Sequence, residues 1–362
     1  MVSVALAGGG TAGHTSPLIA TAKAILELAP QAKLVCIGTP KGLETRVIPA
    51  AGLELKLIPP VPMPRRVNLD LIKLPYRLTK AVWQSRRILR EAKADVLVGF
   101  GGYASIPAYL AARWLGIPVV IHEANLLPGL ANRVGAKFAA RVATAFPDTS
   151  LPKAKHIGMP MAKSISDNPW QPEVARAEFG LAAELPVLLV SGGSQGARAI
   201  NLAVADVIPR LLAAGVQVLH VLGPKNFTDE HQPQQAENGA CYQPVAFVED
   251  MSLAYAAADL MVARAGAATV METAVSGLPV IFIPLPWGNG EQARNAASLV
   301  AVGAGVMLPE SELTADRLAS EVLGLCESAE DLAKMGQLAR EHYPAQAASE
   351  LARTILGLQQ EE

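Results

Sequence analysis

Short apolar runs alternate with longer amphipathic stretches along almost the whole chain. The runs are rich in Val, Ile and Leu, and such runs are typical of strands that are buried on both faces of a parallel sheet. The stretches between them are rich in Ala and Leu and have the length of helices. This alternation predicts an α/β fold with doubly wound, Rossmann-like sheets. The strands that we expect are Val4–Ala7, Leu34–Ile37, Val96–Val98, Val119–Ile121, Val187–Val190, Val216–Val221, Leu260–Val262 and Val280–Ile283.

Two of these strands run directly into a glycine-rich turn, and the two turns lie about half the chain apart. Gly8–Gly13 follows the strand Val4–Ala7, and Ser191–Ala197 follows the strand Val187–Val190. Glycines let backbone N–H groups approach an anion closely, and the N-terminus of the following helix favours negative charge. Two such turns predict two nucleotide-binding-type domains that face a central cleft.

Size and composition agree with two domains. A chain of 362 residues is long for one core, and 51% hydrophobic with 17% charged residues is typical of a well-buried α/β protein. The segment Gly158–Pro172 is rich in Pro, Ser, Asp and Asn, which indicates a boundary. We therefore expect one domain at residues 1–162, a second at 163–341, and a C-terminal helix at 342–362 that crosses back onto the first domain.

Charge and cysteine usage exclude several classes of protein. The net charge of −1 gives no field that would attract nucleic acid. Cys36, Cys241 and Cys326 are odd in number and far apart, so they predict neither a disulfide framework nor a zinc site, and they fit a reducing cytosol. The apolar stretch Val96–Ala112 is interrupted by glycines and a proline, so we expect no membrane span there, and the N-terminus does not have the pattern of a signal peptide.

The first glycine turn offers a candidate catalytic base. Its glycines match the spacing of the dinucleotide fingerprint, which also needs an acidic residue at the end of the second strand. That strand ends at Cys36–Thr39 without an acid, which argues against NAD and leaves either a functional turn of another kind or a plain tight turn. His14 begins the following helix, whose positive end keeps an imidazole neutral. We therefore expect His14 to act as a general base.

Polar residues also follow two other expected strands. His122–Asn125 comes after Val119–Ile121 and is either a site or a simple cap; no second His lies four residues on, so it is not the paired-His zinc motif. Arg264 and Gly266 come after Leu260–Val262 and open a new helix, which favours a pyrophosphate site.

Side chains on the helices that follow Arg264 are suited to a nucleotide sugar. Glu272 can accept hydrogen bonds from ribose hydroxyls. Gln292 and Asn295 share one helix face and can bind sugar hydroxyls, although a solvated helix face is the alternative. The chain contains no Asp-x-Asp pair, so we expect neither a bound metal ion nor another cofactor to assist the reaction.

The segment Arg65–Lys93 is strongly basic, with apolar residues interleaved. It is either an amphipathic helix with a basic outer face or a surface that docks on an anionic bilayer, and nucleic acid is the weaker interpretation. For the bilayer, the residues that we expect to take part are Leu71, Lys73, Leu74, Arg77, Trp83 and Arg86.

Taken together, the motifs resemble those of a known family. They are Gly9–His14, His122–Asn125, Gly192–Ala197, Arg264–Ala267 with Glu272, and Gln292–Asn295, in this order over nearly the whole length. This set is similar to the peripheral membrane N-acetylglucosaminyltransferases of peptidoglycan synthesis. The resemblance implies the GT-B fold, UDP-N-acetylglucosamine (UDP-GlcNAc) as donor and undecaprenyl-pyrophosphoryl-MurNAc-pentapeptide (lipid I) as acceptor. It further implies inversion at the sugar, lipid II as product, a place on the cytoplasmic face of the cell membrane, and other cell-wall synthesis and division proteins as partners.

The same resemblance implies roles for individual residues. Those implied to approach UDP-GlcNAc are Thr11, Ala12, Gly13, Asn125, Lys163, Ser194, Val248, Arg264, Ala267, Ala268, Thr269, Glu272 and Gln292. Those implied to approach the acceptor are Gly10, Thr11, His14, Glu123 and Asn132.

Four positions depart from the family pattern. Ala12 replaces a glycine, Ala124 a glutamine, Lys163 an arginine and Glu291 a glutamine. The methyl group of Ala12 narrows the approach of a diphosphate. Lys163 lacks the bidentate fork of an arginine.

Three alternative functions remain open from the sequence. One is a related glycosyltransferase that acts on another lipid such as diacylglycerol, and another is a UDP-sugar epimerase with a GT-B-like fold. The third is a membrane-bound scaffold that binds the nucleotide sugar without turnover. His14 argues against the scaffold, since pure binding needs no base.

Overall fold

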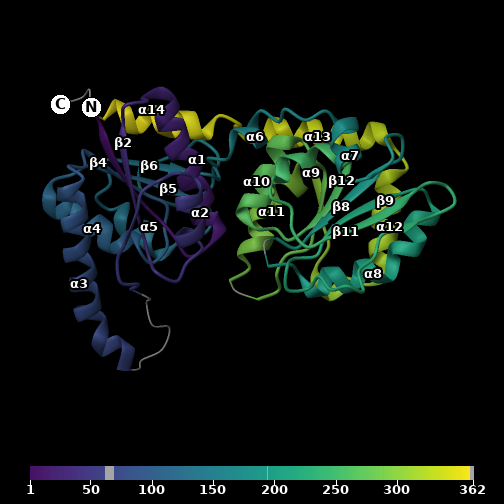
Figure 1. The fold of residues 1–362 in the computed structure, drawn as a ribbon, viewed down its shortest axis with the longest axis horizontal. Helices are drawn as coiled ribbons and strands as arrows, with labels where there is room; N and C mark the ends of the chain where they lie inside the picture. The colour runs from purple at the N-terminus through teal and green to yellow at the C-terminus, as the bar shows by residue number, and fades with distance from the viewer. Residues whose placement is uncertain (62–68, 194, 288, 359–362) are drawn as a thin grey trace. The chain divides into compact units, whose positions relative to one another are not determined.

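The computed structural model describes residues 1–61, 69–193, 195–287 and 289–358; in the helix that begins at Leu69, side chains are described from residue 74. These residues form two compact units, each built on one seven-stranded sheet (Figure 1). The first unit comprises residues 1–162 and 346–362, and the second comprises residues 163–345. The sequence predicts the return to the first unit at residue 342, and the structure has it at Gln346.

The first unit contains an all-parallel sheet with the strand order β3-β2-β1-β4-β5-β6-β7. Its strands are β1 (Ser3–Ala7), β2 (Lys33–Gly38), β3 (Leu55–Leu57), β4 (Val96–Gly99), β5 (Val119–Glu123), β6 (Arg141–Thr144) and β7 (Ala154–His156). Its helices are α1 (Ala12–Leu28), α2 (Glu44–Ala50), α3 (Leu69–Glu91), α4 (Ser105–Leu115), α5 (Leu130–Gly135) and α14 (Ala347–Gly357). Apolar side chains of α1, α2 and α14 cover one face of this sheet, and those of α3, α4 and α5 cover the other.

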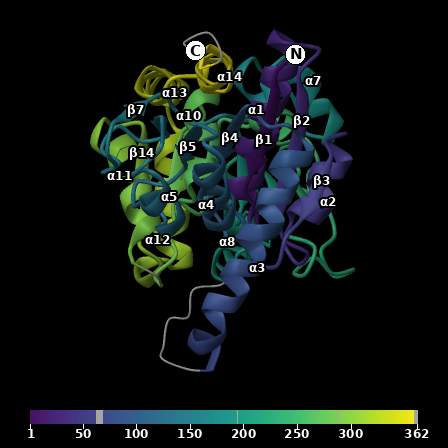
Figure 2. The ribbon, with the colours of Figure 1, turned by 90° about the vertical axis from the view of Figure 1, so that its left-hand side faces the viewer.

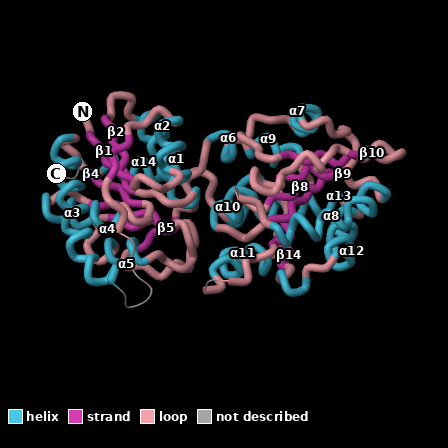
Figure 3. Tube along the Cα trace, turned by 60° about the horizontal axis from the view of Figure 1, so that its bottom comes forward, coloured by secondary structure: helices cyan, strands magenta, loops and turns pink. Residues whose placement is uncertain are grey.

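The second unit contains a sheet with the order β10-β11-β9-β8-β12-β13-β14, in which only the β10–β11 pair is antiparallel. Figure 3 shows these strands as a layer between helices. The strands are β8 (Val187–Ser191), β9 (Gln217–Val221), β10 (Gln234–Gln235), β11 (Cys241–Val245), β12 (Leu260–Ala263), β13 (Val280–Phe282) and β14 (Gly305–Met307). The helices are α6 (Lys163–Ser166), α7 (Pro172–Glu178), α8 (Arg198–Ala213), α9 (Met251–Ala257), α10 (Ala267–Ser276), α11 (Glu291–Ala301), the 3₁₀ turn η1 (Glu310–Glu312), α12 (Ala315–Cys326) and α13 (Ala329–His342).

The strand order confirms the predicted doubly wound fold. All eight expected strands coincide with observed strands; seven agree to within one residue at both ends, and β5 extends two residues beyond its expected end at Ile121. The strands that the sequence did not predict are β3, β6, β7, β10, β11 and β14, which are short or lie toward the edges of the sheets, where the apolar signal is weak. The expected C-terminal helix is α14, which packs against α1.

In each sheet the chain builds outward in both directions from one pair of neighbouring strands. This pair is β1 and β4 in the first unit, and β8 and β12 in the second. The turns after the two strands of such a pair lead away in opposite directions, and ligands of doubly wound sheets bind outside the carboxyl ends of these strands. Both predicted glycine turns therefore leave a sheet at its switch point.

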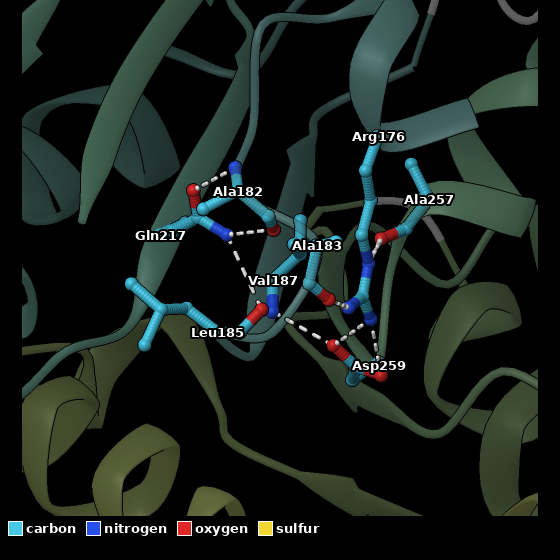
Figure 4. Close-up of polar contacts among 8 residues, drawn as sticks. All are labelled: Arg176, Ala182, Ala183, Leu185, Val187, Gln217, Ala257 and Asp259. Atoms are coloured by element: carbon cyan, nitrogen blue, oxygen red, sulfur yellow. Dashed lines mark hydrogen bonds and ion pairs between the residues drawn. The ribbon is translucent and has the colours of Figure 1, made fainter. Parts of the chain in front are cut away.

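In the second unit, a charged cluster joins the N-terminal ends of β8 and β12, the two strands of the switch point (Figure 4). Nη2 of Arg176 donates to both carboxylate oxygens of Asp259, at 2.9 and 2.8 Å, and Nε donates to the carbonyl of Ala257 at 3.1 Å. Asp259 also accepts the backbone N–H of Val187, the first residue of β8, at 2.8 Å. Because Asp259 directly precedes β12, its hydrogen bond with Val187 links the starts of β8 and β12 at the end away from the turns, and the ion pair with Arg176 holds the carboxylate in place.

Candidate active site

His14 is held by the first glycine turn, which connects β1 to α1. Its Nδ1 lies 3.0 Å from the carbonyl oxygen of Gly9 and 3.3 Å from Oγ1 of Thr11. A carbonyl oxygen can only accept, so this contact assigns the proton to Nδ1. The neutral ring then carries its lone pair on Nε2, which is the form that a general base requires.

Another glycine-rich turn, at Gly101 and Gly102, lies against the turn after β1. The sequence does not predict it as part of the site. It follows β4, and a Cβ atom on Gly102 would lie 2.3 Å from the carbonyl oxygen of Gly9. A Cβ atom on Gly101 would lie 3.1 Å from Nε2 of His14. Only glycine permits this approach, so the ring of His14 lies between two turns at the switch point. The signal in the sequence was three glycines in four positions directly after a buried strand.

Glu123 and Asn132 form a buried network at the end of β5. The carboxylate of Glu123 accepts the backbone N–H groups of Asn125 and Gly129 and the Nδ2 of Asn132, at 3.0, 2.9 and 2.9 Å. The hydroxyl of Tyr109 donates to Oδ1 of Asn132 at 2.7 Å. Burial raises the pKa of Glu123, although these hydrogen bonds oppose the shift. The sequence predicts Glu123 and Asn132 as acceptor contacts, but in the structure their polar atoms hold the loop that carries Asn125.

His122, on β5, is fully buried. Its Nε2 lies 3.0 Å from the carbonyl oxygen of Gly158, to which it donates. Burial lowers the pKa of this imidazole to about 4, so the ring is neutral at physiological pH. His122 thus fixes the end of β5 to the segment that leads out of the first unit.

The N-terminus of α10 forms the corresponding feature of the second unit. Gly266 is the N-cap of α10, and no side chain caps this end of the helix. The backbone N–H of Val270 donates to the carbonyl of Gly266 at 2.9 Å. The N–H groups of the first helical turn, Ala267–Thr269, have no acceptor within the helix. Such a turn favours an anion through its N–H groups and through the helix dipole.

Arg264 directly follows β12, two residues before this N-cap. Its Nη2 forms an ion pair with Oε2 of Glu310 at 2.5 Å, and Nη1 donates to the carbonyls of Ile283 and Pro284 at 3.1 and 3.3 Å. Both charged side chains are largely buried. Arg264 therefore ties the switch point to the loops after β13 and β14, and its predicted contact with a diphosphate would have to share the guanidinium with Glu310.

Glu272 has a partner that the sequence does not indicate. The hydroxyl of Tyr255, on α9, donates to Oε2 of Glu272 at 2.9 Å. Burial raises the pKa of Glu272 to about 7, and the hydrogen bond from Tyr255 opposes that rise. The carboxyl group therefore titrates near neutrality.

Gln292 and Asn295 lie on α11 but differ in what they face. Oε1 of Gln292 accepts the backbone N–H of Leu285 at 3.0 Å, which fixes the amide orientation and points its NH₂ group the other way. Asn295 is buried, with Nδ2 3.5 Å from the carbonyl of Ala265. Of the predicted pair, Asn295 supports the β12–α10 turn.

The other residues predicted to contact the donor differ in their exposure to solvent. Val248 is buried, Lys163 is exposed at the start of α6, and Thr11 is exposed beside the half-buried Ala12 and Gly13. Ser194 lies outside the described residues. Among the residues that the structure describes, no group of three or more His, Cys, Asp or Glu side chains is arranged to hold a metal ion.

The predicted membrane residues lie on α3, whose N-terminal turns extend past the sheet of the first unit (Figure 2). Trp83 is 59% exposed, and the guanidinium of Arg86 lies 4.4 Å from the ring centre of Trp114, which is 62% exposed. Leu74 is half-buried and packs against the core of the first unit, so it is less available for a membrane contact than Trp83. The side chains of Leu71 and Lys73 lie outside the described part, and Arg77 is half-buried.

A helix that spans a bilayer needs about 20 consecutive, mostly apolar residues, and the helices of the described segments differ from this pattern. None of them is both long enough and apolar enough to cross a bilayer.

The two Rossmann-like units have the GT-B fold, and the family matches show that the protein is a glycosyltransferase. Residues 4–144 match the glycosyltransferase family 28 N-terminal domain, and residues 187–351 match the family 28 C-terminal domain. The chain belongs to glycosyltransferase family 28. The predicted fold and enzyme class are thereby confirmed.

Two relatives from different genera share one name. A protein of Cutibacterium acnes named UDP-N-acetylglucosamine–N-acetylmuramyl-(pentapeptide) pyrophosphoryl-undecaprenol N-acetylglucosamine transferase is 56% identical over 364 residues, covering 98% of this chain and 97% of its own length. A protein of Nocardioides with the same name is 51% identical over 357 residues, covering 98% of both chains. The crystal structure of Acinetobacter baumannii MurG has a TM-score of 0.78 at 29% identity, and the match covers 99% of this chain and all of that one.

Proposed function

We propose that this protein transfers N-acetylglucosamine from UDP-GlcNAc to the C4 hydroxyl of MurNAc in lipid I, which gives lipid II. The observation that carries the proposal is the contact between Nδ1 of His14 and the carbonyl of Gly9, from which we infer that the neutral ring has its lone pair on Nε2, beside the turn after β4. The 56% identity to a transferase of that name, over nearly the full length of both chains, supports this choice of donor and acceptor.

The proposed reaction is a direct displacement with inversion. The C4 oxygen of MurNAc forms a bond to the anomeric carbon of the donor sugar, and the bond from that carbon to the β-phosphate oxygen of UDP breaks. Nε2 of His14 takes the hydroxyl proton as general base. UDP leaves with the bonding electron pair, and the N–H groups of Ala267–Thr269 stabilise its growing negative charge, with the guanidinium of Arg264 nearby.

The other residues that we propose to contact the substrates come from both units. Glu272 accepts hydrogen bonds from the ribose, and the NH₂ group of Gln292 donates to the sugar. Ser194, Val248 and Lys163 complete the donor site. From the first unit, Thr11 and Asn125 contact the donor, and Gly10 and Thr11 contact the acceptor. Glu123 and Asn132 act by holding the loop of Asn125.

The transfer reaction should prefer lipid I as acceptor and should need no metal ion. Labelled UDP-GlcNAc should be transferred to a lipid I analogue at least tenfold faster than to diacylglycerol, and transfer should survive excess EDTA, because the chain has no Asp-x-Asp pair and helix N–H groups stabilise the leaving group. Preference for diacylglycerol would favour the related lipid glycosyltransferase, and binding without any transfer would favour a scaffold. Loss of all activity in EDTA, restored by Mg²⁺, would contradict metal independence.

His14→Ala should reduce kcat far more than it weakens UDP binding. Loss of a general base costs roughly a hundred- to ten-thousand-fold in rate. UDP affinity, measured by calorimetry, should change by less than about tenfold, because the proposed UDP contacts belong mainly to the second unit. A variant with normal turnover would remove His14 from the mechanism.

Donor binding should depend on the charge of Glu272. Since the pKa of this carboxyl is about 7, it is ionised at pH 8 and protonated at pH 6, and the ionised form accepts hydrogen bonds from ribose better. UDP affinity should therefore fall from pH 8 to pH 6. Glu272→Gln should weaken binding at pH 8 by about 1.5–3 kcal/mol and reduce this dependence.

The phosphate of UDP also takes up a proton near pH 6, so the informative quantity is the difference between wild type and variant. Tyr255→Phe is the matched variant. It removes the hydrogen bond that lowers the pKa of Glu272, so the loss of affinity should begin at higher pH. Parallel pH curves for all three proteins would place Glu272 away from the ribose.

We further propose that the first unit binds the cytoplasmic face of an anionic membrane through α3 and Trp114. Trp83→Ser with Trp114→Ser should weaken binding to anionic vesicles at low and high salt, because apolar insertion is insensitive to screening. Arg86, Arg87 and Arg90 changed together to Gln should weaken it about a hundredfold at low salt and little at high salt, at about 1 kcal/mol per charge. Leu202→Ser, an exposed change on α8 of the second unit, is the control. Unchanged binding in both α3 variants would contradict this surface.

A further inference from the structure

A buried carboxylate lies directly beneath the first glycine turn. Glu44 is the first residue of α2 and is 0% exposed. Its Oε2 accepts the backbone N–H of Gly10 at 2.7 Å. Its Oε1 accepts the backbone N–H and the hydroxyl of Thr39, at 3.0 and 2.8 Å. The carboxylate therefore joins the turn after β1 to the end of β2.

The glycines around Glu44 make room for this carboxylate. A Cβ atom on Gly9 would lie 2.3 Å from Oε1, and a Cβ atom on Gly42 would lie 1.8 Å from Oε2. Gly9 thus has a role inside the unit in addition to any contact with a ligand. The N–H of Gly10, which could otherwise face an external anion, is held by an internal one.

Glu44 is charged when it makes these contacts. Burial alone would raise its pKa, but the hydrogen bonds from Gly10 and Thr39 outweigh burial and lower the pKa below its usual value. A carboxylate that accepts N–H groups in a buried place forms strong, charge-assisted hydrogen bonds. The turn is therefore fixed by a permanent anion at neutral pH.

The same peptide group connects Glu44 to His14. The C=O of Gly9 and the N–H of Gly10 belong to one trans peptide plane, in which they point in opposite directions. Glu44 holds the N–H end at 2.7 Å, and Nδ1 of His14 binds the C=O end at 3.0 Å. Polarisation of the N–H by a carboxylate also makes the carbonyl a better acceptor.

We propose that Glu44 is a positioning residue for transfer: through the Gly9–Gly10 peptide plane it fixes the orientation of His14 and keeps the ring proton on Nδ1. This inference rests on the proposed function, in which Nε2 of His14 is the base. Glu44 touches neither substrate in this arrangement and acts only through the peptide group.

Glu44→Gln tests the relay with almost no change in volume. The amide can still accept from Thr39, but its NH₂ group then faces the N–H of Gly10, so the peptide plane loses its anchor. We expect kcat to fall by roughly ten- to a hundredfold, as for a base displaced by a fraction of an ångström, with KM for UDP-GlcNAc within about twofold. Thr39→Val is the matched control, since it removes one hydrogen bond to Oε1 and leaves the contact with Gly10; its kcat should stay within about twofold.

A spectroscopic readout separates positioning from general loss of structure. The chain has 6 histidines, so proton–nitrogen correlation spectra of ¹⁵N-histidine-labelled protein at pH 8 are simple, and the signal missing from His14→Ala identifies His14. Wild type and Thr39→Val should show the Nδ1–H tautomer of His14. Glu44→Gln should show a mixture of tautomers. An unchanged tautomer or an unchanged kcat in folded Glu44→Gln would overturn the proposal.

A second variant keeps the test decisive if Glu44→Gln does not fold. Gly42→Ala leaves Glu44 in place but forces its carboxylate away from the turn, and should reproduce both the fall in kcat and the mixed tautomer. Normal kcat and tautomer in Gly42→Ala would equally overturn the proposal. If wild type transfers nothing to lipid I, or if His14→Ala keeps normal turnover, the proposed function fails, whereas the tautomer spectra still report whether Glu44 controls His14.

Discussion

In the turns that follow the strands of a switch point, backbone N–H and C=O groups have no neighbouring strand to pair with. The two units satisfy the hydrogen bonds of these groups differently. In the first unit a buried carboxylate, Glu44, holds the N–H of Gly10, and His14 holds the C=O of Gly9. In the second unit the first turn of α10 presents its N–H groups without a side-chain cap. A turn that is filled from inside orients a side chain, whereas an open helix N-terminus receives an anion. The turn after β1 and the turn before α10 therefore have different chemistry, although each leads from a strand of the switch point into a helix.

The ionisable side chains around α10 are held in position by protein partners before any ligand binds. Arg264 is paired with Glu310, and Glu272 is held by Tyr255. Such groups need little rearrangement when charge develops on a leaving group, which is how preorganised sites lower a barrier. At the other end of the same strands, Arg176 and Asp259 hold β8 and β12 together, so the open turn is supported by a rigid sheet.

The sequence predicts the parts of this arrangement that local pattern controls. The buried strands, the two glycine turns, His14 at the start of α1 and the helix after Gly266 all follow from apolar runs and glycine spacing. Glu44 and Tyr255 could not be found in this way, because their partners Gly10 and Glu272 are distant in sequence and no motif connects them. The inward orientation of Asn295 and Leu74 was missed for a related reason, since several faces of a helix look possible until its neighbours are known.

The division between a filled and an open turn is tested most directly by hydrogen exchange, measured by mass spectrometry with and without saturating UDP. Peptides that cover Ala267–Thr269 should exchange more slowly when UDP is bound, because their N–H groups bind its phosphates. Peptides that cover Gly8–Thr11 should exchange at the same rate in both samples, since the N–H of Gly10 is already held by Glu44. Protection of Gly8–Thr11 with none at Ala267–Thr269 would contradict the account.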